Sequence, residues 1–595
     1  MTTHEINIEF PQLSLYDAQA RTLMAKRGIM RPGESIESVF TRVANTLLEV
    51  DQELNQGRPD SLFASDVKEL IEDKTIAFGT PILANVGREE SPTTAACTVL
   101  PLPVRQGLLL LEEFKMASQE VLEDAVGTGY DLSDLENPVD SLKQMNGFLN
   151  ELNASLIARQ KRPVASMATL RMDHPKILEF IVAKRNEDFS KWRLNLSVFI
   201  TEDLFTKSKN HGSIDLVDHE GAVVGQLSAQ TLLDTIEDCA HYCGEPGILF
   251  RDRFEADNPT PQLKYLSTAP CAEVAMSANE VCQFSYVNLT DLIEESGEKP
   301  VADFSKIQKA AQVLTRLLDA ATQITIDNDL LGRDKIGAKR RIGVGITGFA
   351  GMLINLRIPY DSPEAVLLAK QISELIDFAT KKESVSLAGQ RGAFPMYKQS
   401  RFTDREWVKR KIKKTTGLIS IKDWETLFDD ISRIGIRHAT TTAFPPTGTS
   451  SRIVNTTTSF EPALFLTRGM SKKRTSVSQE EMYDFVARSI MRSMGPDFEN
   501  VLALVAQNGG VVPDFLLRQA GNILAVARQI SAHAHMNIQA AFLQFADESG
   551  AKTINLPQST TIEEMHTIFQ NAYNLGLKGL TVFRENALEE RRIIL

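Results

Sequence analysis

The sequence predicts an α/β fold, and three observations support this. Short apolar segments typical of buried strands alternate with segments of helical periodicity along most of the 595 residues. Several of these strands are apolar throughout, as expected where helices cover both faces of a sheet. The composition, 43% hydrophobic and 24% charged, is that of an ordinary globular protein with a large core. One large α/β domain with a helical N-terminal extension is therefore expected.

The first expected element is an amphipathic helix over 34–54, because apolar side chains recur there at helical spacing. Apolar stretches in "DKTIAFGTPILANVG" and "AACTVLPLP" then read as buried strands bounded by turn residues. The region 103–162 is expected to be mostly helical, interrupted by "GTGYDLSDLENP". No repeat of short period and no long linker divides the chain.

Further strands are expected at "RLNLSVFI" and "GILFRDRF". The stretch "RRIGVGITGFAGML" predicts a strand and a glycine turn that enters a helix, and 363–388 predicts a long helix ending near Gly389. At the C-terminal end, Thr560 or Thr561 caps a helix that runs through Leu575, and "LTVF" forms a strand.

The bulk composition excludes some classes of function. A net charge of −12 argues against broad binding to DNA or RNA, which requires clustered Lys and Arg. Five cysteines in a chain of this length do not predict a disulfide scaffold, so a reducing cytoplasm is expected. The N-terminus "MTTHEINIEF" lacks the features of a signal peptide, and no stretch is apolar enough for a membrane span.

Cys239 and Cys243 are four residues apart on an expected helix, so they share a face. With His241 they resemble half of a metal site, but the chain has no second Cys/His pair at zinc-like spacing. Two small side chains buried in the core are the favoured interpretation, and no metal site is expected.

Cys271 and Glu273 lie in "STAPCAE", where Pro270 resists a regular helix. In an extended or looped segment, residues two apart project to the same side, so the thiol and the carboxylate could face one ligand. The alternative is a buried cysteine beside an exposed glutamate.

Cys97 and Cys282 both lie in strand-like segments, "AACTVL" and "NEVCQFSYVNL". If these strands are neighbours, the two cysteines could form a dithiol that cycles to a disulfide. Two inert core cysteines are the alternative.

The stretch "FPPTGTSSRI" gathers hydroxyl side chains around a glycine, which suits binding of a phosphate. It lacks the lysine of a Walker loop. The glycine-rich stretches "GTG" (127–129) and "GVGITG" (343–348) are weak signals, and Gly343 and Gly345 are expected to allow close packing of a strand and a helix.

Taken together, the segments resemble the large catalytic chain of ribonucleotide reductases, most closely the adenosylcobalamin-dependent (class II) branch. The resemblance covers nearly the whole chain in order. It rests on these segments: "GTPILAN", "AACTVLP", "RPVASMATLRMDHPKILEFIVAKR", "STAPCAE", "EVCQFSYVNLTDL", "RRIGVGITGFAGMLINLRIPYDS", "PPTGTSS" and "HMNIQAAFLQFADESGAKTINLP" with "GLKGLTVFRE".

The resemblance implies a role for each of four residues. Cys271 matches the cysteine whose thiyl radical abstracts the 3′-hydrogen of the ribose, and Glu273 matches the carboxylate that takes the 3′-hydroxyl proton. Cys97 and Cys282 match the dithiol that protonates the 2′-leaving group, supplies two electrons and ends as a disulfide. The implied fold is a ten-stranded α/β barrel with Cys271 on a central finger loop.

The resemblance also implies binding sites. The turn "PTGTSS" matches the cradle for the substrate phosphates, and Thr80 lies where the family contacts the substrate; the expected phosphate contacts are Thr447, Gly448, Thr449 and Ser450. Adenosylcobalamin is the expected cofactor, because Val582 and Phe583 stand where class I chains carry a tyrosine pair.

Four features depart from the family pattern. Ala269 replaces an asparagine whose amide helps to hold the sugar hydroxyls, and Ala272 replaces a glycine of the finger loop. The C-terminal "ENALEERRIIL" carries no cysteine pair for passing electrons. The region 130–162 is shorter than in most relatives, which argues against effector control of substrate choice. Too few residues precede the first barrel strand for an ATP-binding regulatory cone.

The leading hypothesis is thus an adenosylcobalamin-dependent ribonucleotide reductase with an N-terminal helical extension (1–60) and a barrel (61–595). The expected partners are a ribonucleoside di- or triphosphate, an external thiol reductant and, as a homodimer, a second copy of the chain. The alternatives are a repurposed radical enzyme acting on a modified nucleotide or nucleoside, and a non-catalytic homologue that binds nucleotides.

Overall fold

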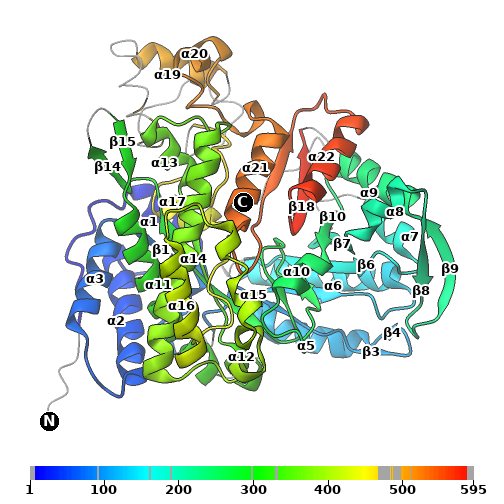
Figure 1. Cartoon of the computed structure of the whole chain (residues 1–595), viewed down its shortest axis with the longest axis horizontal. Helices are drawn as coiled ribbons and strands as arrows, with labels where there is room; N and C mark the ends of the chain where they lie inside the picture. The colour runs from blue at the N-terminus through cyan, green and yellow to red at the C-terminus, as the bar shows by residue number, and fades with distance from the viewer. Residues whose placement is uncertain are drawn as a thin grey trace.

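The structure is a computed structural model that describes residues 7–89, 93–159, 163–185, 187, 191–296, 299–328, 333–466, 483, 485–486, 489, 498–508 and 511–585. It confirms the α/β prediction: a large mixed sheet is surrounded by helices (Figure 1). Within these residues, no helix is long and apolar enough to cross a bilayer.

The sheet has ten strands, which include the segments that carry Cys97 and Cys282. Its order is β1-β13-β2-β5-β6-β7-β10-β18-β17, and β16 pairs with β13. The strands are β1 (Ile76–Phe78), β2 (Cys97–Val99), β5 (Gly127–Asp131), β6 (Ser166–Arg171), β7 (Leu194–Ile200), β10 (Gly247–Phe250), β13 (Val281–Asn288), β16 (Ile342–Thr347), β17 (Thr553–Leu556) and β18 (Gly579–Arg584).

The central strand of this arrangement is β13. One edge of β13 pairs with β16 in parallel, and its other edge is shared by β2 near the start of β13 and by β1 further along. Two single bridges, Val344 to Thr442 and Phe444 to Gly550, then lead from β16 towards β17 at the far end of the sheet. The sheet therefore curls as a barrel does, although in the described residues its ladder is not continuous around a closed barrel.

Helices cover the outside of the sheet in two groups (Figure 1). On one side α11 (Phe304–Asp327) and α14 (Pro363–Arg391) pack together, with α16 (Ile421–Ile434) against α14 and α2 (Ile36–Leu54) against α11. On the other side α9 (Ala229–Cys243) packs with α8 (Asp203–Lys209) and α22 (Ile562–Asn574). The two groups bury separate large hydrophobic cores.

The remaining elements connect these layers. The helices are α1 (Ala18–Lys26), α3 (Ser61–Glu72), α4 (Thr80–Asn85), α5 (Leu111–Glu123), α6 (Pro138–Ala158), α7 (Ile177–Ile181), α10 (Arg251–Asp257), α12 (Arg333–Lys339), α13 (Phe349–Leu356), α15 (Arg405–Lys409), α17 (Gly448–Ile453), α19 (Phe498–Gln507), α20 (Asp514–Gln519) and α21 (Ala532–Leu543). Four hairpins are β3 (Val104–Arg105) with β4 (Leu108–Leu109), β8 (Ser213–Val217) with β9 (Val223–Ser228), β11 (Ser267–Thr268) with β12 (Ala275–Met276), and β14 (Ile293–Ser296) with β15 (Lys299–Ala302).

The N-terminal helices are joined to the rest of the fold by buried ion pairs. Ser35 caps α2, whose apolar face is buried as its periodicity predicts. The Asp51 carboxylate on α2 forms two ion pairs. The guanidinium of Arg316 on α11 lies 2.6 Å from it, and that of Arg391 at the end of α14 also lies 2.6 Å from it. The division of the chain at residue 60 stays a prediction.

Several expected elements differ at their ends. The stretch after β1 is helix α4 rather than a continuing strand, since Pro81 suits the first turn of a helix. The interruption expected in 103–162 contains strand β5. Helix α14 runs past Gly389 to Arg391 and ends at Gly392, whose φ of 84° is a conformation that glycine adopts readily.

Candidate active site

The segment with Cys271 forms the tip of the small hairpin of β11 and β12. The hairpin is closed by the Ala269 amide, which donates to the Val274 carbonyl at 2.8 Å, and the Ala272 amide donates to the Ala269 carbonyl at 2.9 Å. Cys271 is exposed at this tip. Ala272 has a φ of 64°, a left-handed conformation that costs an alanine free energy and a glycine very little. The turn therefore presents Cys271 at the expense of strain at Ala272.

Two glycines let this hairpin lie against the inner side of β5. A Cβ at Gly129 would overlap the Thr268 carbonyl oxygen, so only glycine allows β11 to approach so closely. A Cβ at Gly127 would lie 3.0 Å from Pro270 Cγ and 3.2 Å from Cys97 Sγ. Gly127 thus marks the place where the Cys97 thiol and the base of the Cys271 tip come together. The weak "GTG" signal of the sequence has a packing reason here.

Glu273 is buried, and its side chain is in contact with the backbone of the tip. Burial raises the pKa of its carboxyl to about 7; hydrogen bonds from its own backbone amide and that of Cys271 act in the opposite direction, and the nearby charge of Glu548 raises it further. Its Oε2 has no hydrogen-bond partner among the described residues. The Ser549 amide fixes the same residue by donating to its carbonyl at 2.8 Å. A buried carboxyl that titrates near neutral pH is suited to accept a proton.

Cys97 and Cys282 lie on neighbouring strands, which is the arrangement that a dithiol requires. The two residues are direct partners in the antiparallel ladder of β2 and β13, and neither is in a disulfide. Directly opposed residues of such a ladder have Cα atoms about 4.5–5.5 Å apart, within the range that a disulfide spans. Cys282 is buried, and burial raises the pKa of its thiol well above the usual value, so it stays protonated at neutral pH.

Thr80 lies beside the same half of β13 as the dithiol, whereas the stretch 447–450 reaches towards the other end of that strand. The Gly79 amide donates to the Phe284 carbonyl at 3.1 Å, which places Thr80, the first residue of α4, beside β13. The Ser450 hydroxyl donates to the Phe78 carbonyl at 2.7 Å and ties α17 to the same place. Thr80 therefore lies near the strand of Cys282, and Ser450 is joined to β1 next to it. Thr447 contacts Thr347, the register partner of Asn288 at the far end of β13.

In the turn at 447–450, Thr447 and Ser450 are buried, whereas Gly448 and Thr449 are partly exposed. Thr447 is buried, and its hydroxyl bonds Thr347 at 2.9 Å and accepts the Ser459 amide at 2.8 Å. Thr449 and Gly448 are partly exposed in the first turn of α17. Amides of a first helical turn have no partner within the helix, so these two residues offer backbone donors to an anion.

Gly343 and Gly345 do allow close packing, but against strand β13 and the segment at 443–445 rather than against a helix as expected. A Cβ at Gly343 would lie 2.6 Å from the Phe284 ring, and one at Gly345 would lie 2.7 Å from the Ala443 carbonyl. The glycines of β16 thus allow the segment that leads into the turn at 447–450 to cross the strand directly.

A buried group of ion pairs lies behind the hairpin, and no sequence pattern predicts it. Arg341 contacts Glu280 at 2.6 Å, forms an ion pair with Glu548, and donates to the Ala275 carbonyl of β12 at 2.9 Å. All three charged residues are buried. Their partners come from segments far apart in the chain, which is why spacing could not reveal them.

Asn195 on β7 is a second residue that sequence reasoning missed. Its Nδ2 donates to the Pro270 carbonyl at 3.1 Å. A signal existed, because Asn195 and Ser197 interrupt the otherwise apolar run "LNLSVFI".

Cys239 and Cys243 are buried on one face of α9, as the core interpretation predicts. Their sulfurs are 3.9 Å apart. His241 instead directs Nε2 to the Thr560 carbonyl at 2.7 Å.

Ala269, where the sequence comparison expects an asparagine, is fully buried in the main hydrophobic core. Its side chain offers no polar group to a ligand, and its surroundings are those of a packed residue.

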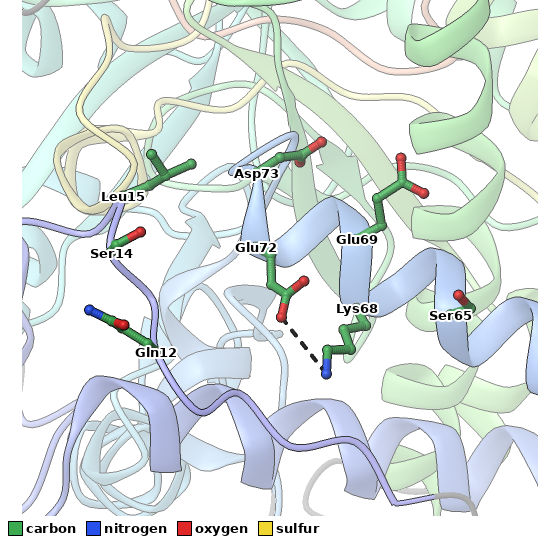
Figure 2. Close-up of a pocket in the computed structure, with 8 residues that line it drawn as sticks. All are labelled: Gln12, Ser14, Leu15, Ser65, Lys68, Glu69, Glu72 and Asp73. Atoms are coloured by element: carbon green, nitrogen blue, oxygen red, sulfur yellow. Dashed lines mark ion pairs between the residues drawn. The ribbon is translucent and has the colours of Figure 1, made fainter.

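A surface depression elsewhere contains none of the predicted site residues (Figure 2). It has a volume of 440 Å³ and lies between the N-terminal segment and α3. Its lining is mostly charged or polar, with an ion pair of 3.8 Å between Lys68 and Glu72. This composition does not resemble a site for redox chemistry.

Comparison with known proteins agrees with this geometry. Residues 96–583 match the model of the family described as "Ribonucleotide reductase, barrel domain". A vitamin B12-dependent ribonucleoside-diphosphate reductase of Thermoplasma acidophilum is 27% identical over 589 residues, covering 96% of this chain and 70% of the relative. The enzyme of the same name from Mycobacterium tuberculosis is 28% identical over 577 residues, covering 94% and 77%.

A vitamin B12-dependent ribonucleotide reductase of Streptomyces coelicolor is 22% identical over 584 residues, and the match covers 88% of this chain but 60% of that relative. The match to the family model includes Cys97 on β2, Cys271 and Glu273 in the hairpin tip, and Cys282 on β13. The chain therefore belongs to the ribonucleotide reductase family, as a member of its barrel-domain group.

Proposed function

We propose that the protein reduces ribonucleotides to 2′-deoxyribonucleotides by thiyl-radical chemistry. The observation that carries the proposal is the pairing of Cys97 with Cys282 in one ladder, next to the hairpin tip that presents Cys271 and Glu273. A reaction that removes a hydroxyl as water needs two electrons and a proton donor, and a cross-strand dithiol beside an exposed thiol supplies both.

The roles of the side chains follow from their surroundings. A thiyl at Cys271 removes the 3′-hydrogen of the ribose, and Glu273 accepts the 3′-hydroxyl proton, which suits a carboxyl with a pKa of about 7. The dithiol protonates the 2′-hydroxyl, which leaves as water, and gives up two electrons while one disulfide forms. Cys271 then returns its hydrogen to the 3′ carbon, so the radical is regenerated.

Adenosylcobalamin, the cofactor that the relatives' names indicate, would supply the radical when bound. The residues present fit this assignment, because Cys271 is the exposed thiol of the site whereas Cys282 is buried. Val582 and Phe583 on β18 carry no phenol that could deliver a radical in its place. Cys271 is the residue that would face the cofactor.

The turn at 447–450 is proposed to hold the substrate phosphates through the backbone donors of Gly448 and Thr449. Thr447 and Ser450 would shape this turn through hydroxyls already bonded to the fold. Thr80, at the start of α4 and beside β13, would contact the substrate. The relatives' names favour a diphosphate substrate.

Two further assignments belong to this proposal. A thiol reductant from outside the site would return the Cys97–Cys282 disulfide to the dithiol after each turnover. A homodimer in the cytoplasm is the expected state of the chain.

The test is anaerobic turnover of each ribonucleoside diphosphate and triphosphate with adenosylcobalamin and dithiothreitol, beside Cys271→Ala. We expect 2′-deoxy product from the wild-type chain and none from the variant. Absence of product under every nucleotide and effector combination would overturn the proposal. Cofactor cleavage without product would point instead to a modified nucleotide, and nucleotide binding without cleavage to a non-catalytic homologue.

A further inference from the structure

Asn195 lies inside the sheet at the base of the hairpin that carries Cys271. Its neighbours Leu194 and Leu196 point outward into the core beneath α9 and α22, so Asn195 lies on the opposite, inner face of β7. Phe199, four residues further along the same inner face, belongs to a buried cluster with Tyr265, which precedes the hairpin, and Ala275 of β12. Asn195 is nevertheless exposed, and it is the one exposed residue of β7.

The amide of Asn195 is oriented by the group that it contacts. Its partner, the Pro270 carbonyl oxygen at 3.1 Å, can only accept a hydrogen bond, so the side chain must direct Nδ2 towards it. This contact joins β7 to the hairpin tip across 75 residues of sequence.

The Pro270 carbonyl and the Cys271 amide are the two ends of one peptide group. The amide end bonds the Glu273 carboxylate, and the carbonyl end accepts from Asn195. One planar unit therefore connects Asn195 to the proposed base, and it contains the backbone nitrogen of the proposed radical residue. Hydrogen bonds that share a peptide group polarise one another, so a donor at the carbonyl strengthens donation by the N–H.

We propose that Asn195 is a positioning residue that fixes the Pro270–Cys271 peptide group and, through it, orients both Cys271 and the Glu273 carboxylate. The inference deepens the proposed function and rests on it.

The hairpin tip needs support of this kind. Two of its backbone bonds, from Ala269 to Val274 and from Ala272 to Ala269, lie within the hairpin itself. Ala272 is held in a left-handed conformation that favours relaxation of the turn. Ala269 contributes only packing. Asn195 and the Ser549 amide hold the tip from outside, on opposite sides of Cys271 in the sequence.

The test compares Asn195→Ala and Asn195→Asp with Asn146→Ala. Asn146 is a matched control, because its amide bonds the Lys191 carbonyl at 2.9 Å and the Arg193 amide at 2.8 Å, just before the same strand, without contacting the hairpin. The first readout needs no turnover: the rate at which iodoacetamide alkylates Cys271 in the protein without cofactor, measured on the Cys271 peptide with the Cys97 peptide as internal reference.

We expect iodoacetamide to alkylate Cys271 faster in Asn195→Ala than in the wild-type chain, while the alkylation rate of Cys97 stays the same. In Asn146→Ala, both rates should match those of the wild-type chain. In turnover, we expect kcat to fall about tenfold with KM held within about twofold, as for loss of one hydrogen bond of about 1.4 kcal/mol. The acid limb of the pH–kcat profile should move to higher pH, because a weaker Cys271 N–H bond raises the Glu273 pKa. Asn195→Asp should move it further, since it adds a negative charge.

Equal Cys271 alkylation in Asn195→Ala and Asn146→Ala would overturn the inference. So would a rise in KM alone, which would make Asn195 a substrate contact, or a lower kcat with an unshifted pH profile. If the wild-type chain yields no deoxy product, the proposed function fails, while the alkylation comparison still decides whether Asn195 holds the tip.

Discussion

Cys97 and Cys282 face each other as register partners across the antiparallel ladder of β2 and β13. The Ala96 amide donates to the Cys282 carbonyl at 3.1 Å, so the ladder continues beside the pair and holds the two strands together. The fold thus sets the separation of the two thiols, and formation of a disulfide needs no rearrangement of the backbone.

This relationship predicts a defined stoichiometry. Prereduced enzyme without added thiol should yield about one deoxynucleotide per chain, because one dithiol supplies one pair of electrons. Peptide mass spectrometry should then find the Cys97–Cys282 disulfide, and dithiothreitol should restore turnover. Cys282→Ser should lose turnover altogether.

The control for this experiment is Cys239→Ala, which alters a buried cysteine of α9 and should keep the same stoichiometry. Several products per chain without reductant, or a disulfide between other cysteines, would contradict the assignment.

Turnover should depend on pH through Glu273. A base must be deprotonated to accept a proton, so kcat should fall as the pH drops below about 7, where the Glu273 carboxyl gains its proton. The pH–kcat profile of the wild-type chain measures this directly. An acid limb near the ordinary glutamate value of 4.5 would show that Glu273 is not the group that titrates.

The same pKa predicts a trend in stability. Folding raises the Glu273 pKa from 4.5 to about 7, so the unfolded chain loses this proton first and stability falls as the pH rises between these values. Glu273→Gln cannot ionise. The free energy of unfolding of Glu273→Gln should therefore equal that of the wild-type chain below pH 4.5. Above pH 7 it should exceed the wild-type value by on the order of 3 kcal/mol. Thermal melts of both proteins at pH 4.5 and 8 provide the comparison; equal melting differences at the two values would contradict it.

Ala272 is predicted to be a strained position. Its φ of 64° suits glycine, so Ala272→Gly should raise the free energy of unfolding by about 0.5–1 kcal/mol, the left-handed cost less the added entropy of the unfolded chain. Ala272→Val should lower it, since a branched side chain tolerates this conformation less well. Urea unfolding of the three proteins gives the order, and the reverse order would refute the strain.

Gly129 is predicted to be essential for seating the hairpin. A Cβ there would overlap the Thr268 carbonyl oxygen, so Gly129→Ala must push β11 away from β5, at a cost of about 1–3 kcal/mol or more. We expect a lower melting temperature and lost turnover. Gly147→Ala on α6 is the matched control, because nothing lies within 4 Å of its added Cβ. That variant should be neutral or more stable by up to about 1 kcal/mol.

The amino-acid sequence by itself determined the local features. The helix expected over 34–54, the cap expected at Thr560 or Thr561, and the strands around Cys97, Cys282 and Phe583 are formed where pattern and capping chemistry predict them. These features depend on residues close in the chain, so the information that specifies them is local. The ordered motifs likewise pointed to the family and to the four residues that are proposed to carry the chemistry.

The tertiary structure alone decided which residues meet. The register of Cys97 with Cys282, the support of Pro270 by Asn195, and the buried contacts of Arg341 join segments 61 to 207 residues apart. Such pairings are fixed by the strand order of the whole sheet and by burial, neither of which is encoded in any short stretch. Burial is also what moves the Glu273 pKa, because removal of water disfavours the charged carboxylate wherever it stands in the sequence.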